Sequence, residues 1–148
     1  MNIQSFHQAA MGCLSSSKNL HFVPLYACSV AAGFPSPADD YIQKNIDLNE
    51  ELVVNPLATF FVRVKGDSMK NASINDGDVL IVDRSLVVRN NDIVVAVIDG
   101  ELTVKRFNKL PDKVLLQAEN PDYAPFIIAN ERDFSIWGVV TTVIHSVR

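Results

Sequence analysis

The sequence predicts a mainly β protein, and three observations support that prediction. The chain has 148 residues, of which 48% are hydrophobic and 20% charged, the balance of a globular protein with one proper core. From residue 59 onward, short apolar stretches rich in valine, isoleucine and phenylalanine favour strands over helices. Proline and Asn-Pro punctuation separates these stretches. We therefore expect a β-rich body over residues 33–148, preceded by an N-terminal arm over residues 1–32.

The expected strands show two kinds of pattern. Apolar and polar residues alternate after residue 59, which indicates a half-buried strand, whereas residues 79–82 and 93–98 are continuously apolar, as in strands buried on both faces. Asp99-Gly100 predicts a two-residue hairpin turn between two of the strands. The strands are expected over residues 59–65, 79–82, 93–98, 101–107, 113–117, 126–128 and 135–144, in a mostly antiparallel arrangement.

Short helices are expected ahead of the strands. Ser36 has the properties of an N-cap, with Pro37 at the first helical position and Asp39 at the third. We expect a short helix from there through Tyr41, Ile42 and Ile46. Residues 49–52 are expected to form another helical turn.

The arm differs in composition from the rest of the chain. Residues 1–32 are rich in serine and contain one basic residue, Lys18, but no carboxylate, and they show no clear periodicity. We expect a weakly structured, flexible arm. The remaining residues carry 12 Lys and Arg against 17 Asp and Glu, a net charge of −5. Because nucleic-acid affinity comes mainly from neutralising phosphates, we expect no direct DNA binding by this acidic body.

The cysteines and the hydropathy pattern indicate a cytoplasmic protein. Cys13 and Cys28 are too few for a disulfide framework and form no CxxC metal motif, so we expect a reducing compartment and no metal or other cofactor. A secretory signal needs an uninterrupted apolar run, but polar residues 15–19 and His21 interrupt this one. No stretch approaches the roughly 20 apolar residues of a membrane span.

Two short patterns carry candidate chemistry. Gly66-Asp67-Ser68-Met69 follows a predicted strand, and a glycine there permits a tight turn that presents the Ser68 hydroxyl. Thr103, Lys105 and Phe107 share one face of another strand, so Lys105 is a candidate for burial, which would lower its pKa and make it a possible base. Each pattern alone has a commoner explanation, an incidental surface turn for Ser68 and a snorkelling side chain for Lys105.

The order of these patterns along the chain is more specific than either one. Small residues at 31–33 come first, the Ser68 turn second, and Lys105 third, 37 residues after the serine. The longer motifs around them are Gly33-Phe34-Pro35-Ser36-Pro37-Ala38, Gly66-Asp67-Ser68-Met69, Ile74-Asn75-Asp76-Gly77-Asp78-Val79-Leu80-Ile81-Val82-Asp83, Asp99-Gly100-Glu101-Leu102-Thr103-Val104-Lys105-Arg106 and Trp137-Gly138-Val139-Val140. On these motifs, residues 33–148 resemble the UmuD and LexA family of self-cleaving Ser–Lys peptidases.

The resemblance implies a fold and a role for individual residues. The body would have the LexA and signal-peptidase β-fold. Ser68 matches the family nucleophile, Lys105 its general base, and Ala32–Gly33 the cleaved bond. Thr103 would orient Lys105, while Gly66 and Met69 support the serine turn. Cys28–Ser29 is a rival cleavage bond, because UmuD proteins often have Cys-Gly at the site, but no glycine follows Cys28.

The resemblance also implies partners and a biological role. The family's cleaved product is a homodimer that joins a UmuC-type Y-family polymerase in error-prone translesion synthesis during the SOS response. Cleavage is stimulated by the RecA–single-stranded-DNA filament, and a sliding clamp is a further candidate partner. A LexA-type repressor, a signal peptidase and a non-catalytic β-rich binding module are the alternatives. Residues 1–32 are too short for a helix-turn-helix module, and a signal peptidase would need a membrane segment. Whether cleavage is within one chain or between dimer partners stays open.

Overall fold

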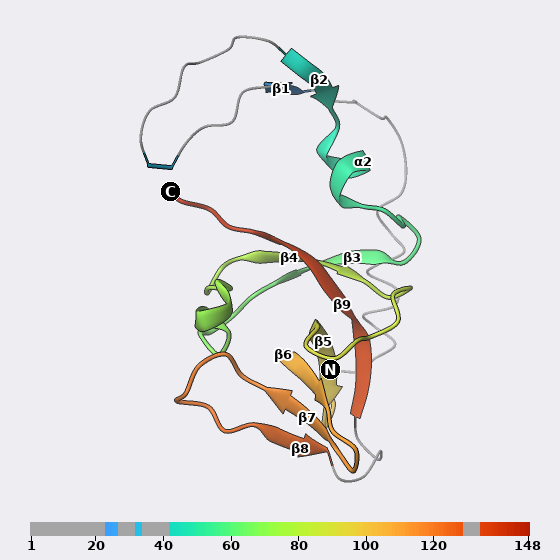
Figure 1. Cartoon of the computed structure of the whole chain (residues 1–148), viewed down its shortest axis with the longest axis vertical. Helices are drawn as coiled ribbons and strands as arrows, with labels where there is room; N and C mark the ends of the chain where they lie inside the picture. The colour runs from blue at the N-terminus through green and yellow to red at the C-terminus, as the bar shows by residue number, and fades with distance from the viewer. Residues whose placement is uncertain (1–22, 27–31, 34–41, 129–133) are drawn as a thin grey trace. The chain divides into compact units, whose positions relative to one another are not determined.

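The computed structural model describes residues 23–26, 32–33, 42–128 and 134–148 (Figure 1). The chain divides into two compact units, one up to Leu48 and one from Asn49 to the C-terminus. The predicted boundary after residue 32 is a cleavage bond and not a division between compact units. The division after Leu48 therefore does not test it, and the boundary after residue 32 stays a prediction. Among the helices of the described ranges, none combines the length and the hydropathy that crossing a bilayer requires.

In the first unit, two strands pair antiparallel. Strand β1 (Val23–Tyr26) lies beside β2 (Ile42–Ile46), with Val23 opposite Ile46. The predicted helix through Ile42 and Ile46 is therefore wrong. Isoleucine is β-branched and favours strands, and pairing with β1 satisfies backbone groups that a helix would have satisfied internally. The expectation of a weakly structured arm is likewise wrong at Val23–Tyr26. The predicted helix start at residues 36–41 lies outside the described residues.

The second unit is built on one seven-stranded antiparallel sheet, which confirms the mainly β prediction. The short helix α2 (Leu48–Leu52) confirms the predicted turn at residues 49–52. The strands lie in the order β3-β4-β9-β5-β6-β7-β8. Their bounds are β3 (Thr59–Arg63), β4 (Val79–Asp83), β5 (Ile93–Ile98), β6 (Glu101–Lys109), β7 (Val114–Gln117), β8 (Phe126–Ile128) and β9 (Phe134–Ile144). All seven strands agree with the predicted ranges to within two residues.

The hairpin between β5 and β6 has the predicted turn. Asp99 and Gly100 both have positive φ, 51° and 82°, as a two-residue turn that matches strand twist requires. The six pairs from Ile98↔Glu101 to Ile93↔Arg106 follow without a bulge. This register places Lys105 opposite Val94, the fully buried second residue of β5. The turn therefore fixes which residues of β6 face the interior.

The hydrophobic core has two clusters, and β5 contributes to both. Val95 belongs to a cluster with Met69, Ile74, Leu80 and Val82. Its neighbours Val94 and Ala96 point to the opposite face of the sheet and pack with Phe107 and Leu116. The strand is thus buried on both faces, as its continuous apolar run predicted. Figure 1 shows the long strand β9 passing from β5 to β4, which joins the two parts of the sheet.

Close approach between β9 and β4 depends on Gly138. The two strands change register between Ile81 and Val82. A Cβ built on Gly138 would lie 2.8 Å from Val82 Cγ1 and 2.9 Å from the Asp83 carbonyl oxygen. The second contact is with backbone, which cannot move aside as a flexible side-chain end can. Glycine is therefore required at this position for steric reasons.

Gly138→Ala is expected to destabilise the fold by about 1–3 kcal/mol, the usual range for overpacking a core. The midpoint of thermal unfolding should fall by about 2–4 °C for each kcal/mol lost. Urea unfolding followed by circular dichroism measures the change. Ser135→Ala, at an exposed position of the same strand, is the control and should stay near the wild-type value. Equal stabilities of the two variants would contradict the steric explanation.

Candidate active site

Ser68 lies in a tight turn that leaves β3 and enters the short 3₁₀ helix Lys70–Ala72. Gly66 has φ of 91°, a conformation that favours glycine, and its N–H donates to Asp76 Oδ1 at 2.6 Å. Met69 is 2% exposed and packs in the core, whereas Ser68 is only partly buried. Gly66 fixes the backbone path of the turn, and Met69 anchors the turn in the core. The Ser68 hydroxyl is therefore presented at a defined position.

Lys105 is buried on β6. Its side chain is 5% exposed, and Phe107, two residues on and facing the same way, is 8% exposed. A lysine rarely occupies such a position, because removing an ammonium from water is costly. The period of two along the strand predicted this burial, and the structure confirms it.

The Lys105 amine contacts three oxygen atoms. Nζ lies 3.0 Å from Ser68 Oγ, 3.0 Å from Thr103 Oγ1 and 2.9 Å from the carbonyl oxygen of Val104. A protonated amine donates all three of its hydrogens to these oxygens. A neutral amine has two hydrogens and a lone pair, and the Val104 carbonyl can only accept. Neutral Lys105 can therefore donate to Val104 and Thr103 and accept the proton of Ser68.

Burial lowers the pKa of Lys105 below the ordinary lysine value. Desolvation disfavours the charged amine, and it is the dominant cause of this shift. A lowered pKa raises the fraction of neutral amine at a given pH. The arrangement therefore has the two properties of a serine–lysine dyad, a short contact between hydroxyl and amine and an amine that gives up its proton more readily than usual.

Backbone donors lie next to the serine hydroxyl. Among the hydrogen bonds formed within the described residues, none uses the N–H of Ser68 or of Met69. Free N–H groups beside a nucleophile can stabilise an oxyanion if they point to where it forms. The turn thus offers candidate donors for such a site.

Comparisons with known proteins agree with this geometry. Residues 24–141 match the family described as Peptidase S24-like. The chain belongs to the Peptidase S24-like family. Ser68, Lys105 and Thr103 all lie inside the matched residues, and the match confirms the resemblance to UmuD and LexA proteins drawn from the motifs.

Individual relatives of this S24 protein are similar over most of its length. It is 42% identical to Protein MucA of Salmonella typhimurium over 127 residues, 86% of this chain and 87% of MucA. It is 45% identical to Protein SamA of Salmonella typhimurium strain LT2 over 125 residues, 84% and 86% of the two chains. MucA and SamA are UmuD-like. Its identity to LexA repressor 1 of Geobacter sulfurreducens is 44% over 115 residues, which are 77% of this chain but 56% of the repressor.

The structure brings together the predicted dyad and its supporting residues but does not test the cleavage bond. Gly66, Met69 and Thr103 adjoin Ser68 or Lys105 as expected. Ala32 and Gly33 form an exposed bend in the first unit. The rival bond Cys28–Ser29 lies outside the described residues. His145 pairs with Asp78, at 2.6 Å from Nδ1 to Oδ1, and takes no part in the described contacts of Ser68 or Lys105.

Sequence reasoning missed the residues of another loop that form hydrogen bonds with the serine turn. Asp67, beside Ser68, contacts Asn120 and Tyr123 of the loop between β7 and β8. The sequence offered one signal, Asn120-Pro121, which was interpreted only as a break between strands. A buried amide and a turn residue look alike in sequence, because both positions favour asparagine.

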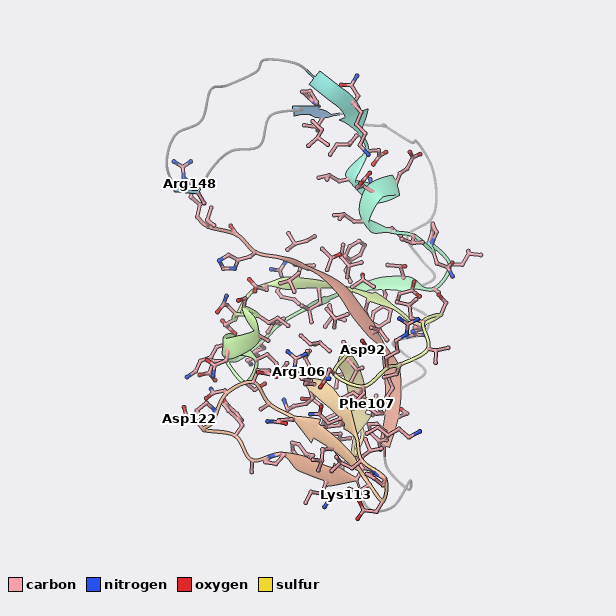
Figure 2. All side chains as sticks on the ribbon, in the orientation of Figure 1. Asp92, Arg106, Phe107, Lys113, Asp122 and Arg148 are labelled. Atoms are coloured by element: carbon pink, nitrogen blue, oxygen red, sulfur yellow. The ribbon has the colours of Figure 1, made fainter. Side chains whose placement is uncertain are left out.

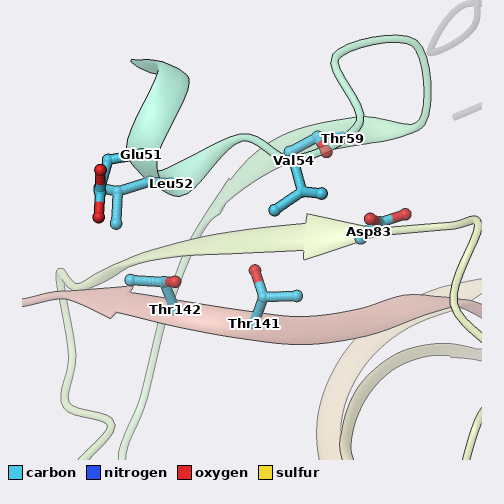
Figure 3. Close-up of a pocket in the computed structure, with 7 residues that line it drawn as sticks. All are labelled: Glu51, Leu52, Val54, Thr59, Asp83, Thr141 and Thr142. Atoms are coloured by element: carbon cyan, nitrogen blue, oxygen red, sulfur yellow. The ribbon is translucent and has the colours of Figure 1, made fainter. Parts of the chain in front are cut away.

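A separate cavity of about 140 Å³ lies between the α2 region and strands β3, β4 and β9 (Figure 3). It is lined by Glu51, Leu52, Val54, Thr59, Asp83, Thr141 and Thr142. None of these residues belongs to the dyad. The Asp83 carboxylate already accepts hydrogen bonds from the backbone and hydroxyl of Ser85, at 2.7 and 2.6 Å. We assign this cavity no part in the chemistry of the family.

Proposed function

We propose that this protein is a self-cleaving serine peptidase of the SOS response, in which Ser68 and Lys105 cut the chain's own Ala32–Gly33 bond. The observation that carries the proposal is the 3.0 Å contact between Ser68 Oγ and the buried Lys105 Nζ. A lysine held at 5% exposure against a serine hydroxyl, with a lowered pKa, is costly for stability and useful for base catalysis. The exposed bend at Ala32–Gly33 suits a bond that must enter another binding groove.

The first half of the reaction forms an ester. Neutral Lys105 accepts the proton of Ser68 Oγ as the oxygen attacks the carbonyl carbon of Ala32. The oxyanion that forms would accept hydrogen bonds from the N–H groups of Ser68 and Met69. The tetrahedral intermediate then collapses: the C–N bond breaks, the Lys105 ammonium donates its proton to the nitrogen of Gly33, and Ala32 remains as an ester on Ser68.

The second half of the reaction hydrolyses that ester. Lys105, neutral again, takes a proton from water, and the resulting hydroxide attacks the Ala32 carbonyl carbon. Collapse of the second intermediate breaks the bond to Ser68 Oγ, which recovers its proton from Lys105. Thr103 and the Val104 carbonyl hold the amine in place throughout. The products are residues 1–32 with a new carboxylate and residues 33–148 with a new amino terminus.

Regulation follows from the substrate being part of the same chain. The rate is reduced by the fraction of time that the cleavage segment is out of the groove. We infer that the RecA–single-stranded-DNA filament stimulates cleavage by binding the cleavage-competent pose more tightly than the other poses. The product, residues 33–148, would act in the cytoplasm as a homodimer with a UmuC-type Y-family polymerase in translesion synthesis, with the sliding clamp as a further partner.

The test of this proposal is a change in mass. Purified protein is incubated at alkaline pH, or at neutral pH with RecA, ATP and single-stranded DNA, and then examined by mass spectrometry. We expect the intact chain to be replaced by two fragments that end at Ala32 and begin at Gly33. Ser68→Ala is the control and should stay intact under both conditions. A wild-type chain that stays intact in both would favour a non-catalytic β-rich binding module, and cleavage at Cys28 would favour the rival bond.

A further inference from the structure

A buried side-chain amide, that of Asn120, contacts the residue before Ser68 in the serine turn. Asn120 is 2% exposed, in the loop between β7 and β8. Its Nδ2 donates to the main-chain carbonyl oxygen of Asp67 at 3.2 Å and lies 3.4 Å from Asp67 Oδ2. Its Oδ1 accepts from the N–H of Asp122 at 3.1 Å. Both ends of the amide are therefore used, and the donor end is aimed at the residue that precedes Ser68.

The same loop holds the turn at two more points. The N–H of Asn71 donates to the Glu119 carbonyl oxygen at 2.9 Å, and the Tyr123 hydroxyl donates to Asp67 Oδ1 at 2.7 Å. Lys70 adds weak ion pairs, 3.9 Å from Asp67 and 3.7 Å from Asp122, at exposed positions. Figure 2 shows Asp122 in this loop, away from the strands of the sheet. The Ser68 turn is therefore fastened on both sides of the serine.

The loop is also fastened to the strand that carries the base. Arg106 follows Lys105 on β6, and its Nε forms an ion pair with the Glu119 carboxylate. Arg106 also stands opposite Gln117 in the pairing of β6 with β7. Residues 117–123, which we term the brace, thus contact the Lys105 strand at one end and the Ser68 turn at the other. The brace therefore links the two halves of the dyad, in addition to the core cluster in which Met69 packs and against which Val104 of β6 lies.

We propose that Asn120 is a positioning residue for self-cleavage: by holding the Asp67 carbonyl it sets the distance between Ser68 Oγ and Lys105 Nζ. The proposal rests on the function proposed above. Proton transfer needs a short, aligned contact, and a misplacement of about 1 Å can cost a hundredfold in rate. Asn120 matters more than Tyr123 because it is buried, so water cannot replace its hydrogen bonds, whereas Tyr123 is 45% exposed.

The experiment measures self-cleavage of the full chain in Asn120→Ala and Asn120→Asp. We expect the alanine variant to cleave about ten- to a hundredfold more slowly at the alkaline plateau. The aspartate variant should be slower still, because a carboxylate oxygen would face two acceptors, the Asp67 carbonyl and carboxylate. A crystal structure of Asn120→Ala should show Ser68 Oγ displaced from Lys105 Nζ, beyond the 3.0 Å of the wild type.

The pH profile separates positioning from other roles. The charged groups around the dyad and the brace, Asp67, Lys70, Arg106, Glu119 and Asp122, together with Tyr123, are all retained in Asn120→Ala. Because burial of Lys105 dominates its lowered pKa, the pH midpoint should stay where it is while the plateau falls. Asn90→Ala removes an exposed amide that lies outside the brace and accepts from the Lys109 N–H at 2.7 Å, and it is the matched control that should cleave as the wild type does.

Three results would overturn the proposal. The first is an Asn120→Ala chain that cleaves at the wild-type rate. The second is a slow variant whose loss is matched by the fraction unfolded at the assay temperature and disappears on cooling. The third is a variant structure that keeps the 3.0 Å contact. A wild-type chain that never cleaves would overturn the proposed function as well, whereas these three results leave cleavage by Ser68 and Lys105 intact.

Discussion

Replacing Lys105 with arginine is expected to abolish self-cleavage even though the positive charge is kept. Arginine stays protonated at every pH at which a protein is folded, so it cannot accept the Ser68 proton. Loss of a general base typically lowers a rate about a hundred- to ten-thousandfold, which would leave cleavage below detection in an already slow self-reaction. The measurement is the time course of intact chain, followed by mass spectrometry at alkaline pH and with the RecA filament.

Two further variants make the result specific to the base. Lys105→Met keeps much of the side-chain length and the apolar surroundings but has no proton acceptor, so it should be as inactive as Lys105→Arg. Lys109→Arg, at an exposed position of the same strand, is the matched control and should cleave as the wild type does. Thermal unfolding of each variant shows whether it is folded. A folded Lys105→Met chain that still cleaves at Ala32–Gly33 would exclude Lys105 as the base.

Most of the body of this protein could be predicted from sequence because its signals are local. The Asp99-Gly100 turn and the apolar run of β5 each specify structure within a few residues, and together they fix the register that buries Lys105. The Ser68 turn is equally local, since it needs a glycine with positive φ two residues before the serine. The contact between Ser68 and Lys105 is not local. It was expected because of the family resemblance, and periodicity alone predicted only the burial of the lysine.

The failures have a common physical cause, which is pairing between distant segments. The helix signal at Ser36-Pro37 suggested a helical continuation through Ile42, but β1 provides a strand partner 16–23 residues earlier in the chain. Likewise, the role of Asn120 depends on Asp67, which is 53 residues away in sequence. Neither β1 nor Asp67 can be recognised as a partner from the residues next to β2 or Asn120 in the sequence. Tertiary contacts outweigh local propensity at such positions, because intrinsic preferences amount to less than about 1 kcal/mol per residue.

The unassisted rate of self-cleavage is expected to rise with pH and then level off. The active form of Lys105 is the neutral amine, and below its pKa the neutral fraction increases about tenfold for each pH unit. Burial lowers the pKa of this amine, so the plateau should begin at a lower pH than an ordinary lysine, with a pKa of about 10.4, would give. Across two pH units below the midpoint, the rate should therefore change about a hundredfold.

The groups near the dyad allow this rise to be assigned to Lys105. The Tyr123 hydroxyl holds the pKa of the Asp67 carboxyl below its usual value, so Asp67 is charged throughout the neutral and alkaline range. The same hydrogen bond raises the pKa of the Tyr123 hydroxyl above its ordinary value. Tyr123→Phe removes that second titrating group and should leave the midpoint unchanged. The Ser68→Ala variant, assayed at each pH, gives the background rate of hydrolysis by hydroxide, which is subtracted from the wild-type rate.

The shape of the profile decides between two kinds of chemistry. A buried amine acting as base gives a slope that ends in a plateau while circular dichroism still reports a folded chain. Direct attack by hydroxide gives a rate that keeps rising tenfold per pH unit, with no plateau and with no dependence on Ser68. A flat profile would mean that neither the Lys105 proton nor hydroxide limits the reaction, and the 3.0 Å contact with Ser68 would then have to be explained as structural.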